Sequence, residues 1–222
     1  MRVVVLSDVH CSGLDDPIQQ EFVQWLDALD ADGLWMLGDI FHWGWSFGTA
    51  LQPAVQPVVD ALARAQNRGV KLLFVGGNHD FATIRALSKS LDIEIRGAHT
   101  RQIAGRKVFL AHGDEADRSM GYRLTHWLLR GAIFRSLVTL LGPAVGSSLL
   151  RGLAGAQNVD HFRPGDSRPV EWLKSQLHSG TTLAICGHFH MASRESCAAG
   201  EVVTLGAGGG QSAVWLVDGQ LV

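Results

Sequence analysis

Short apolar runs alternate with segments of helical period through the first half of the chain. Strand-length apolar runs occupy residues 2–7, 33–37 and 71–75. Between them, the pattern predicts an amphipathic helix over 17–29 and another within 50–69. Because strands and helices alternate, we expect a mainly parallel sheet that is covered on both faces.

The second half of the chain has a different pattern. It predicts a hairpin over 100–114, mostly helix over 118–156, a helix near 170–177, a strand over 181–186 and antiparallel strands from 193 onward. We therefore predict an α/β protein, a two-sheet sandwich flanked by helices, with a helical lid insertion. Its single domain spans residues 1–222, and the lid occupies about 116–165.

Polar side chains that can bind metals follow five of the predicted strands. These are Asp8 and His10, then Asp39, then Asn78, His79 and Asp80, then His112, and finally His188 and His190. One Asp after a strand is more often a helix cap or a turn residue. Ligands in open α/β sheets, however, bind beyond the carboxyl ends of the strands, so five such ends favour one shared site.

Oxygen and imidazole donors without thiolates suit Mn²⁺, Fe²⁺, Zn²⁺ or Mg²⁺ rather than a cysteine-rich zinc site. The candidate ligands are Asp8, His10, Asp39, Asn78, His112, His188 and His190. Seven donors exceed what one tetrahedral ion takes, which favours two divalent metal ions that share a bridging carboxylate. Such pairs stabilise the attacking and leaving oxygens of a phosphoryl displacement.

In their order along residues 8–190, DVH, GDIF, GGNHD, AHGD and GHFH resemble the five motifs of calcineurin-like metallophosphoesterases. The resemblance implies that Asp8, His10 and His190 hold one metal, that Asn78, His112 and His188 hold the other, and that Asp39 bridges them. It also implies that His79 contacts the substrate phosphate and that Asp80 fixes the ring of His79. The implied reaction is in-line attack by a hydroxide held between the metals.

The predicted lid is basic and apolar. Between residues 118 and 159 the chain carries five arginines and no lysine or acidic residue, a net charge of +5 against −7 for the rest. One interpretation is a helical hairpin that completes the core with solvated arginines. The other is a lid that meets anionic lipid through arginine while Trp127 and Phe134 enter the acyl region.

Residues 112–153 are similar to the helical lid of UDP-2,3-diacylglucosamine diphosphatases, with Gly121 and Tyr122 matching a Gly-Tyr pair. The resemblance implies cleavage of a pyrophosphate to UMP and a lipid monosaccharide phosphate in lipid A biosynthesis, usually with Mn²⁺. It implies Tyr122 as a substrate contact besides Asn78 and His79. The chain has His79 where those enzymes have arginine. The alternatives are therefore a soluble metallophosphoesterase acting on another phosphodiester, nucleotide or phosphoprotein, and a scaffold that has lost catalysis.

Composition and length set further bounds. A net charge of −2 argues against a nucleic-acid partner, and three cysteines without metal-pair spacing suggest a reducing compartment. The longest uncharged apolar stretch, residues 136–150, is shorter than the roughly 20 residues of a membrane-spanning helix. We expect a cytoplasmic protein that can lie on the inner membrane surface. His42 follows the second motif and could line the site, but a structural or solvated role is the expectation.

Overall fold

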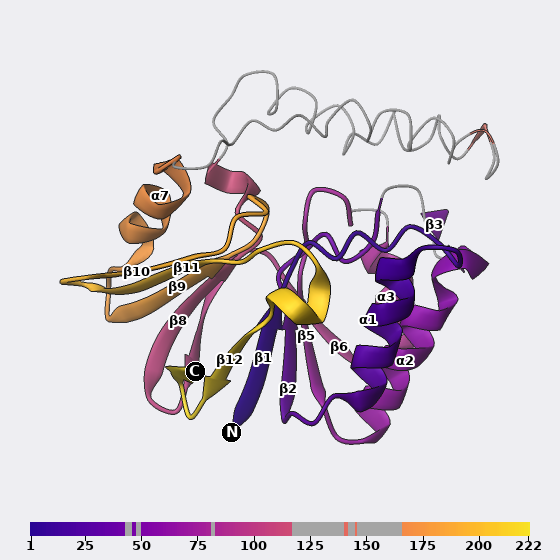
Figure 1. Ribbon diagram of the computed structural model, residues 1–222, viewed down its shortest axis with the longest axis horizontal. Coiled ribbons are helices and arrows are strands. Elements are labelled where there is room, and N and C mark those ends of the chain that lie inside the picture. The colour runs from indigo at the N-terminus through magenta and orange to yellow at the C-terminus, as the bar shows by residue number, and fades with distance from the viewer. Residues whose placement is uncertain (43–45, 48–49, 81–82, 117–139, 142–144, 146–165) are drawn as a thin grey trace.

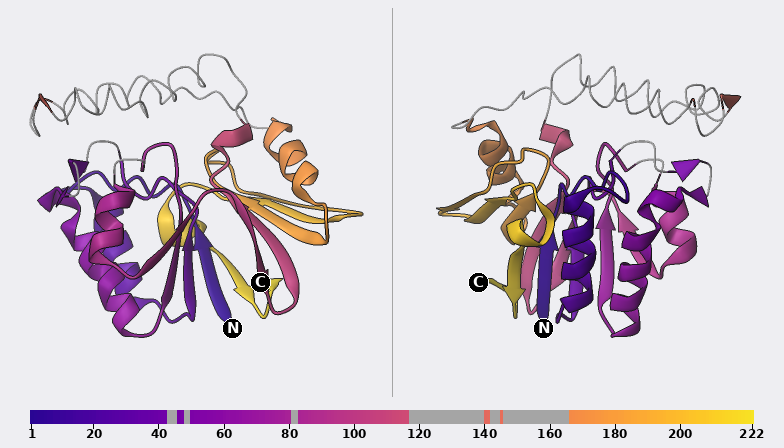
Figure 2. Two further views of the ribbon diagram at one scale, coloured as in Figure 1. Left: turned by 180° about the vertical axis from the view of Figure 1, so that it is seen from behind. Right: turned by 45° about the vertical axis from the view of Figure 1, so that its right-hand side comes forward.

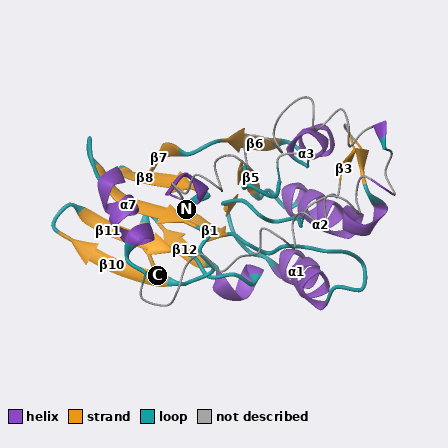
Figure 3. Ribbon diagram, turned by 90° about the horizontal axis from the view of Figure 1, so that it is seen from above, coloured by secondary structure: helices purple, strands orange, loops and turns teal. Residues whose placement is uncertain are grey.

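The computed structural model describes residues 1–42, 46–47, 50–80, 83–116, 140–141, 145 and 166–222. Two β-sheets pack face to face, and helices cover the outer face of each (Figure 1). This arrangement confirms the predicted α/β sandwich. Seen from above, α1, α2 and α3 lie at one end of the layered structure and α7 at the other (Figure 3).

The first sheet has six strands in the order β13-β12-β1-β2-β5-β6. The strands are β1 (Arg2–Leu6), β2 (Gly33–Met36), β5 (Lys71–Val75), β6 (Ile93–Arg96), β12 (Val214–Val217) and β13 (Gln220–Leu221). The strands β1, β2, β5 and β6 run parallel, as predicted for the first half of the chain, and β12 pairs antiparallel with β1. Its outer helices are α1 (Pro17–Ala28), α2 (Gln56–Asn67) and α3 (Ile84–Ser90).

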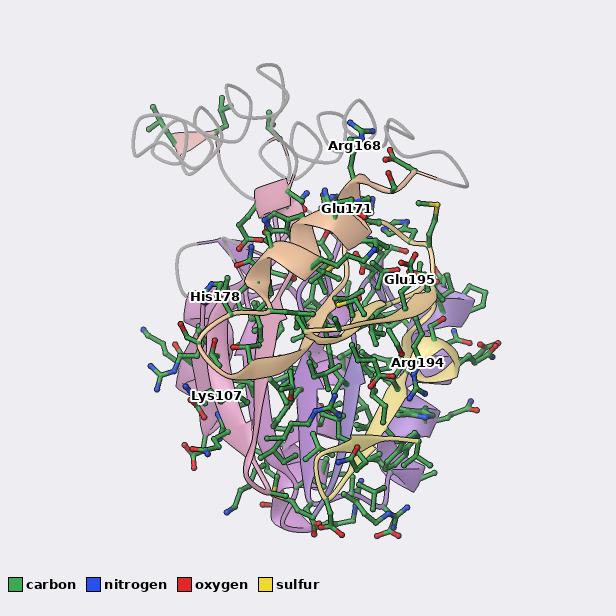
Figure 4. All side chains as sticks on the ribbon, turned by 90° about the vertical axis from the view of Figure 1, so that its left-hand side faces the viewer. Lys107, Arg168, Glu171, His178, Arg194 and Glu195 are labelled. Carbon is green, nitrogen blue, oxygen red and sulfur yellow. The ribbon has the colours of Figure 1, made fainter. Side chains whose placement is uncertain are left out.

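The second sheet has five strands in the order β10-β11-β9-β8-β7. The strands are β7 (His99–Ile103), β8 (Arg106–Ala111), β9 (Thr181–Cys186), β10 (Ser193–Cys197) and β11 (Gly200–Thr204). The predicted hairpin is confirmed, because β7 and β8 pair antiparallel across a turn at Ala104 and Gly105. Helix α7 (Arg168–Gln176) covers the outer face of this sheet (Figure 4). Its Leu173 belongs to one buried hydrophobic cluster with Ala184 and Val202 of the sheet.

Strand β1 explains why the sequence runs are apolar without alternation. Val3 and Val5 face the second sheet and join the core between the two sheets. Val4 and Leu6 point the other way, into the core that the first sheet forms with its helices. Since successive side chains of a strand point to opposite faces, a strand with both faces covered must be apolar throughout.

Some elements are absent from the sequence prediction. The short helix α3, the edge strand β6, and the hairpin of β3 (Ser46–Phe47) and β4 (Ala50–Leu51) were not predicted. The C-terminal strands do form antiparallel hairpins, but β11 also pairs parallel with β9, and β12 joins the other sheet. Three 3-10 helices, η1 (Pro53–Val55), η2 (Asp114–Ala116) and η3 (Gly209–Ser212), complete the described elements.

Most of the predicted lid lies outside the described residues, including Tyr122, Trp127, Phe134 and the five arginines. Of its described positions, Leu140 is 84% exposed and Val145 is 56% exposed. Among the helices that the structure describes, none has the length and apolar character to cross a lipid bilayer.

Candidate metal centre

The loops that follow β1, β2, β5, β8 and β9 gather at one end of the sandwich, opposite both chain termini (Figure 2). These loops carry every predicted metal ligand. Ligand atoms of Asp8, His10 and His190 lie within 4.8 Å of one another, as do those of Asp39, His112 and His188. Asn78 joins the second group, since its Oδ1 lies 3.0 Å from Nε2 of His112.

The first group is built around the buried carboxylate of Asp8. Its Oδ2 accepts hydrogen bonds from Ser7 Oγ at 2.5 Å and from the backbone N–H of His188 at 2.8 Å. Its Oδ1 is buried and has no hydrogen-bond partner among the described residues, although Nε2 of His190 lies 3.4 Å away and Nε2 of His10 lies 3.9 Å away. The two imidazole nitrogens are 3.1 Å apart. An unsatisfied buried carboxylate oxygen facing two imidazoles fits a divalent cation.

In the second group, a backbone carbonyl orients the histidine. Nδ1 of His112 donates to the carbonyl of Leu37 at 2.8 Å, because a carbonyl oxygen can only accept. Nε2 therefore faces the site, where it lies 3.4 Å from Oδ2 of Asp39. A partner on the outer ring nitrogen is typical of histidines that bind metals.

The charges of the clustered side chains follow from burial and proximity. Burial opposes ionisation of Asp39, yet the neighbouring His112 and His79 lower its pKa well below the usual value. Burial works against the positive charge of His112, but the Asp39 charge raises its pKa well above 6.5. Burial lowers the pKa of His79 to about 3 and that of His188 to about 4. His112 must therefore release a proton before Nε2 can bind a cation.

Five of the seven candidate ligands adopt a left-handed backbone conformation. They are Asp8 (φ 54°), His10 (φ 54°), Asp39 (φ 53°), His188 (φ 72°) and His190 (φ 55°). This region costs L-residues roughly 1–2 kcal/mol each, with Asp and Asn tolerated best. The loops are tied together by backbone hydrogen bonds from Asp8 N to Gly38 O (3.0 Å) and from His10 N to Asp39 O (2.9 Å). Sharp turns after the strands therefore aim the side chains into one space.

Two glycines allow this close packing. A side chain at Gly77 would overlap the Asp39 carboxylate, and one at Gly187 would overlap Ser7 and Asp8. Glycine is therefore required for steric reasons at the positions before Asn78 and His188, because side chains of one loop occupy the space beside the backbone of another.

Asp80 was expected to fix the ring of His79, but its hydrogen bonds go to the backbone. Its carboxylate accepts from the N–H groups of Asp39 (2.5 Å), Gly77 (3.2 Å) and Phe41 (3.3 Å). Burial and the Asp39 charge raise its pKa to about 7. Asp80 thereby joins the loops after β2 and β5, and its role at the His79 ring stays a prediction.

His79 is buried beside Asp39, and its contact with the substrate phosphate stays a prediction. It is 6% exposed, its backbone N–H donates to Asp39 Oδ1 at 2.9 Å, and its Nε2 lies 3.7 Å from Asp39 Oδ2.

Two further side chains border the site, and sequence reasoning missed the first of them. Ser7 bonds the Asp8 carboxylate, and a small polar residue just before the first motif was the only available signal. His42 was expected to be structural or solvated, yet its ligand atom lies within 4.8 Å of those of His10 and His79. Its place directly after GDIF is the signal that left a position at the site open.

Fold and site together define a metal-dependent phosphoesterase, a hydrolase whose clustered carboxylates and imidazoles lie at the ends of the strands of a two-sheet α/β sandwich. The sequence profile of the calcineurin-like phosphoesterases matches residues 1–205, so the chain belongs to that family. The family implies a dimetal site, and the described residues include two clusters that could hold it.

Several curated relatives share one name. The chain is similar to proteins named UDP-2,3-diacylglucosamine hydrolase from Porphyromonas gingivalis (26% identity, 86% of this chain and 83% of the relative) and Aeromonas salmonicida (28%, 86% and 78%). The relative from Pseudomonas putida is 26% identical over 85% of this chain and 81% of its own length. Among solved structures, a novel archaeal phosphodiesterase aligns with a TM-score of 0.50 over 98% of this chain and 93% of that one; its 14% identity supports the fold alone.

Proposed function

We propose that the two clusters bind one divalent cation each. Asp8, His10 and His190 hold the first, Asn78, His112 and His188 hold the second, and Asp39 bridges them. The observation that carries this assignment is the convergence of these side chains from five loops, with a buried Asp8 oxygen left unsatisfied. Oxygen and imidazole donors suit Mn²⁺, which we propose as the working metal, with Fe²⁺, Zn²⁺ and Mg²⁺ as other candidates for this donor set.

Bound cations would supply an activated water and neutralise charge on the phosphoryl oxygens. The remaining work belongs to side chains of this chain. The carbonyl of Leu37 holds the Nε2 of His112 toward the site, and Asp80 holds the backbone at Asp39. His79 and Asn78 contact the substrate phosphate, where His79 stabilises its charge or protonates the leaving oxygen.

For the substrate, we propose UDP-2,3-diacylglucosamine, cleaved by water at its pyrophosphate to give UMP and a lipid monosaccharide phosphate. Support comes from relatives that carry that name over most of this chain and most of their own length. The arginine-rich segment between 118 and 159 suits a substrate with phosphates and acyl chains, because the planar guanidinium binds phosphate with two donors. Tyr122 is a proposed contact in the same segment. The product would enter lipid A biosynthesis.

We also propose that the insertion rests on an anionic lipid surface at the inner face of a membrane. Leu140 and Val145 are large apolar side chains that are mostly exposed, in the segment that carries the excess positive charge. Apolar side chains that enter the acyl boundary, together with arginines that meet phosphate headgroups, bind such a surface.

A substrate panel tests the proposed reaction. With Mn²⁺ present, purified protein is expected to release UMP from UDP-2,3-diacylglucosamine and little from UDP-glucose, which lacks acyl chains. The Asp39→Ala variant is expected to lose activity on every substrate, because both cations lose a ligand. Asp30→Ala is a matched control at a surface carboxylate that is 91% exposed. Equal turnover of both sugar nucleotides would instead favour a soluble phosphoesterase with another substrate.

The contribution of the insertion to lipid binding can be tested separately from hydrolysis at the metal centre. Replacing Leu140 and Val145 by serine is expected to raise the KM for the acylated substrate and to weaken sedimentation with vesicles that contain phosphatidylglycerol. Hydrolysis of a small phosphodiester should stay unchanged, since the metal ligands are untouched. An unchanged KM together with unchanged vesicle binding would remove the membrane part of the proposal and leave the reaction in place.

A further inference from the structure

The ring of His42 stacks on the ring of His79. The two imidazole rings stack with centroids 5.4 Å apart and an interplanar angle of 29°. The ring of His42 also meets that of His10 edge to face, at 5.9 Å and 83°. The carboxylate of Asp80, the next residue after His79, accepts from the backbone N–H groups of Asp39, Phe41 and Gly77.

The backbone holds His42 in place from two sides. Its N–H donates to the carbonyl of Cys11 at 3.0 Å, and Cys11 and Phe41 form an isolated parallel bridge. The N–H of Phe41 donates to Asp80. The segment that carries His42 is therefore fixed both to the loop after β1 and to the loop that carries His79.

We infer that His42 is a positioning residue, which holds the ring of His79 at the angle needed to meet the substrate phosphate. A flat partner restricts rotation of an imidazole while leaving its ring nitrogens available to a ligand. His42 acts through its aromatic face and contacts neither cation. This inference rests on the proposed function, in which His79 contacts the phosphate.

The inference separates His42 from a further metal ligand or a direct phosphate contact. A ligand or a phosphate contact needs the ring nitrogens of His42, whereas a positioning residue needs only its flat surface. Phenylalanine keeps the flat surface and removes the nitrogens. The pair His42→Ala and His42→Phe therefore distinguishes these roles, with His79→Ala as the background that removes the ring being positioned.

The experiment measures binding of orthovanadate, a phosphate analogue, to the Mn²⁺-loaded protein by calorimetry, together with metal content by elemental analysis. His42→Ala is expected to weaken vanadate binding by about two- to tenfold, the range set by one aromatic pair, with metal content unchanged. His42→Phe is expected to bind within about twofold of wild type. In the His79→Ala background, His42→Ala should add no further loss.

Three results would overturn the inference. His42→Phe as weak as His42→Ala would mean that the ring nitrogens bind the anion directly. A fall in metal content in both variants would make His42 a ligand. An equal loss in the His79→Ala background would mean that His42 acts independently of His79. If His79→Ala itself leaves vanadate affinity unchanged, the proposed contact between His79 and the phosphate fails as well. Failure of the proposed function is therefore distinguishable from failure of the positioning role of His42 alone.

Discussion

The carboxylate of Asp80 accepts a 2.5 Å hydrogen bond from the backbone N–H of Asp39. The two residues stand 41 positions apart, and Asp39 has a left-handed backbone (φ 53°). Buried Asp80 thus holds the main chain of Asp39, and the side chain of Asp39 is the proposed bridge between the cations. The role of Asp80 at the His79 ring stays a prediction, and this backbone role is an observation beside it.

Replacing Asp80 by asparagine should therefore destabilise the protein without removing a proposed metal ligand. The carboxylate serves three backbone donors, and an amide has one oxygen in place of two, so at least one buried N–H loses its acceptor. We expect a loss of about 1–3 kcal/mol in the free energy of unfolding, measured with urea on the metal-free protein. Asp60→Asn, at an exposed helix position, is the control. A loss no larger than that of the control would contradict the role of Asp80.

A methyl group at Gly77 should disrupt the metal centre, because it would overlap the Asp39 carboxylate. For Gly77→Ala we expect substoichiometric Mn²⁺ by elemental analysis and a lower melting temperature. Gly97→Ala is the matched control, since a side chain at Gly97 would meet nothing within 4 Å. Full metal content in Gly77→Ala would show that the loops can separate at little cost.

An alanine variant is usually more stable than the glycine variant at the same position, and at His190 we expect the reverse. His190 has φ 55° and is about half exposed, so truncation removes little packing, and only glycine adopts this conformation freely. We expect His190→Gly to be more stable than His190→Ala by about 1 kcal/mol in the metal-free protein, by thermal unfolding. At Arg194, in the extended strand β10, the same pair should show the ordinary order, with alanine more stable. If the alanine variant were more stable than the glycine variant at both positions, the left-handed turn at His190 would carry no strain.

The stability of the metal-free protein should depend on pH through His188. Burial and the nearby charge of His112 lower the pKa of His188 to about 4, against 6.5 for the unperturbed side chain. The folded state therefore binds fewer protons than the unfolded state below pH 6.5. The stability that the neutral ring provides is complete above that pH and is lost as the pH falls toward 4.

We expect the difference in unfolding free energy between wild type and His188→Asn to shrink steadily from pH 6.5 to 4.5, in urea titrations with a chelator present. His178→Asn, at an exposed position on the loop before β9, is the control (Figure 4). Parallel pH profiles for wild type and His188→Asn would show that this histidine is not held neutral.

The sequence by itself determined the parallel strands of the first sheet and the candidate ligands at their ends. Fully buried strands must be apolar throughout, and their carboxyl ends meet at one edge, so the positions of Asp8, Asp39 and Asn78 follow from local pattern. The glycines before Asn78 and His188 also stand out in the sequence, although only the structure shows which side chains they make room for.

Only the tertiary structure decided the partners of those residues. Three contacts join segments that are far apart in the chain. They are the pairing of β12 with β1 in the first sheet, the backbone contacts of Asp80, and the stacking of His42 on His79. Periodicity records which face of an element is buried. Which group lies opposite depends on how the loops pack, and that packing is set by the whole fold.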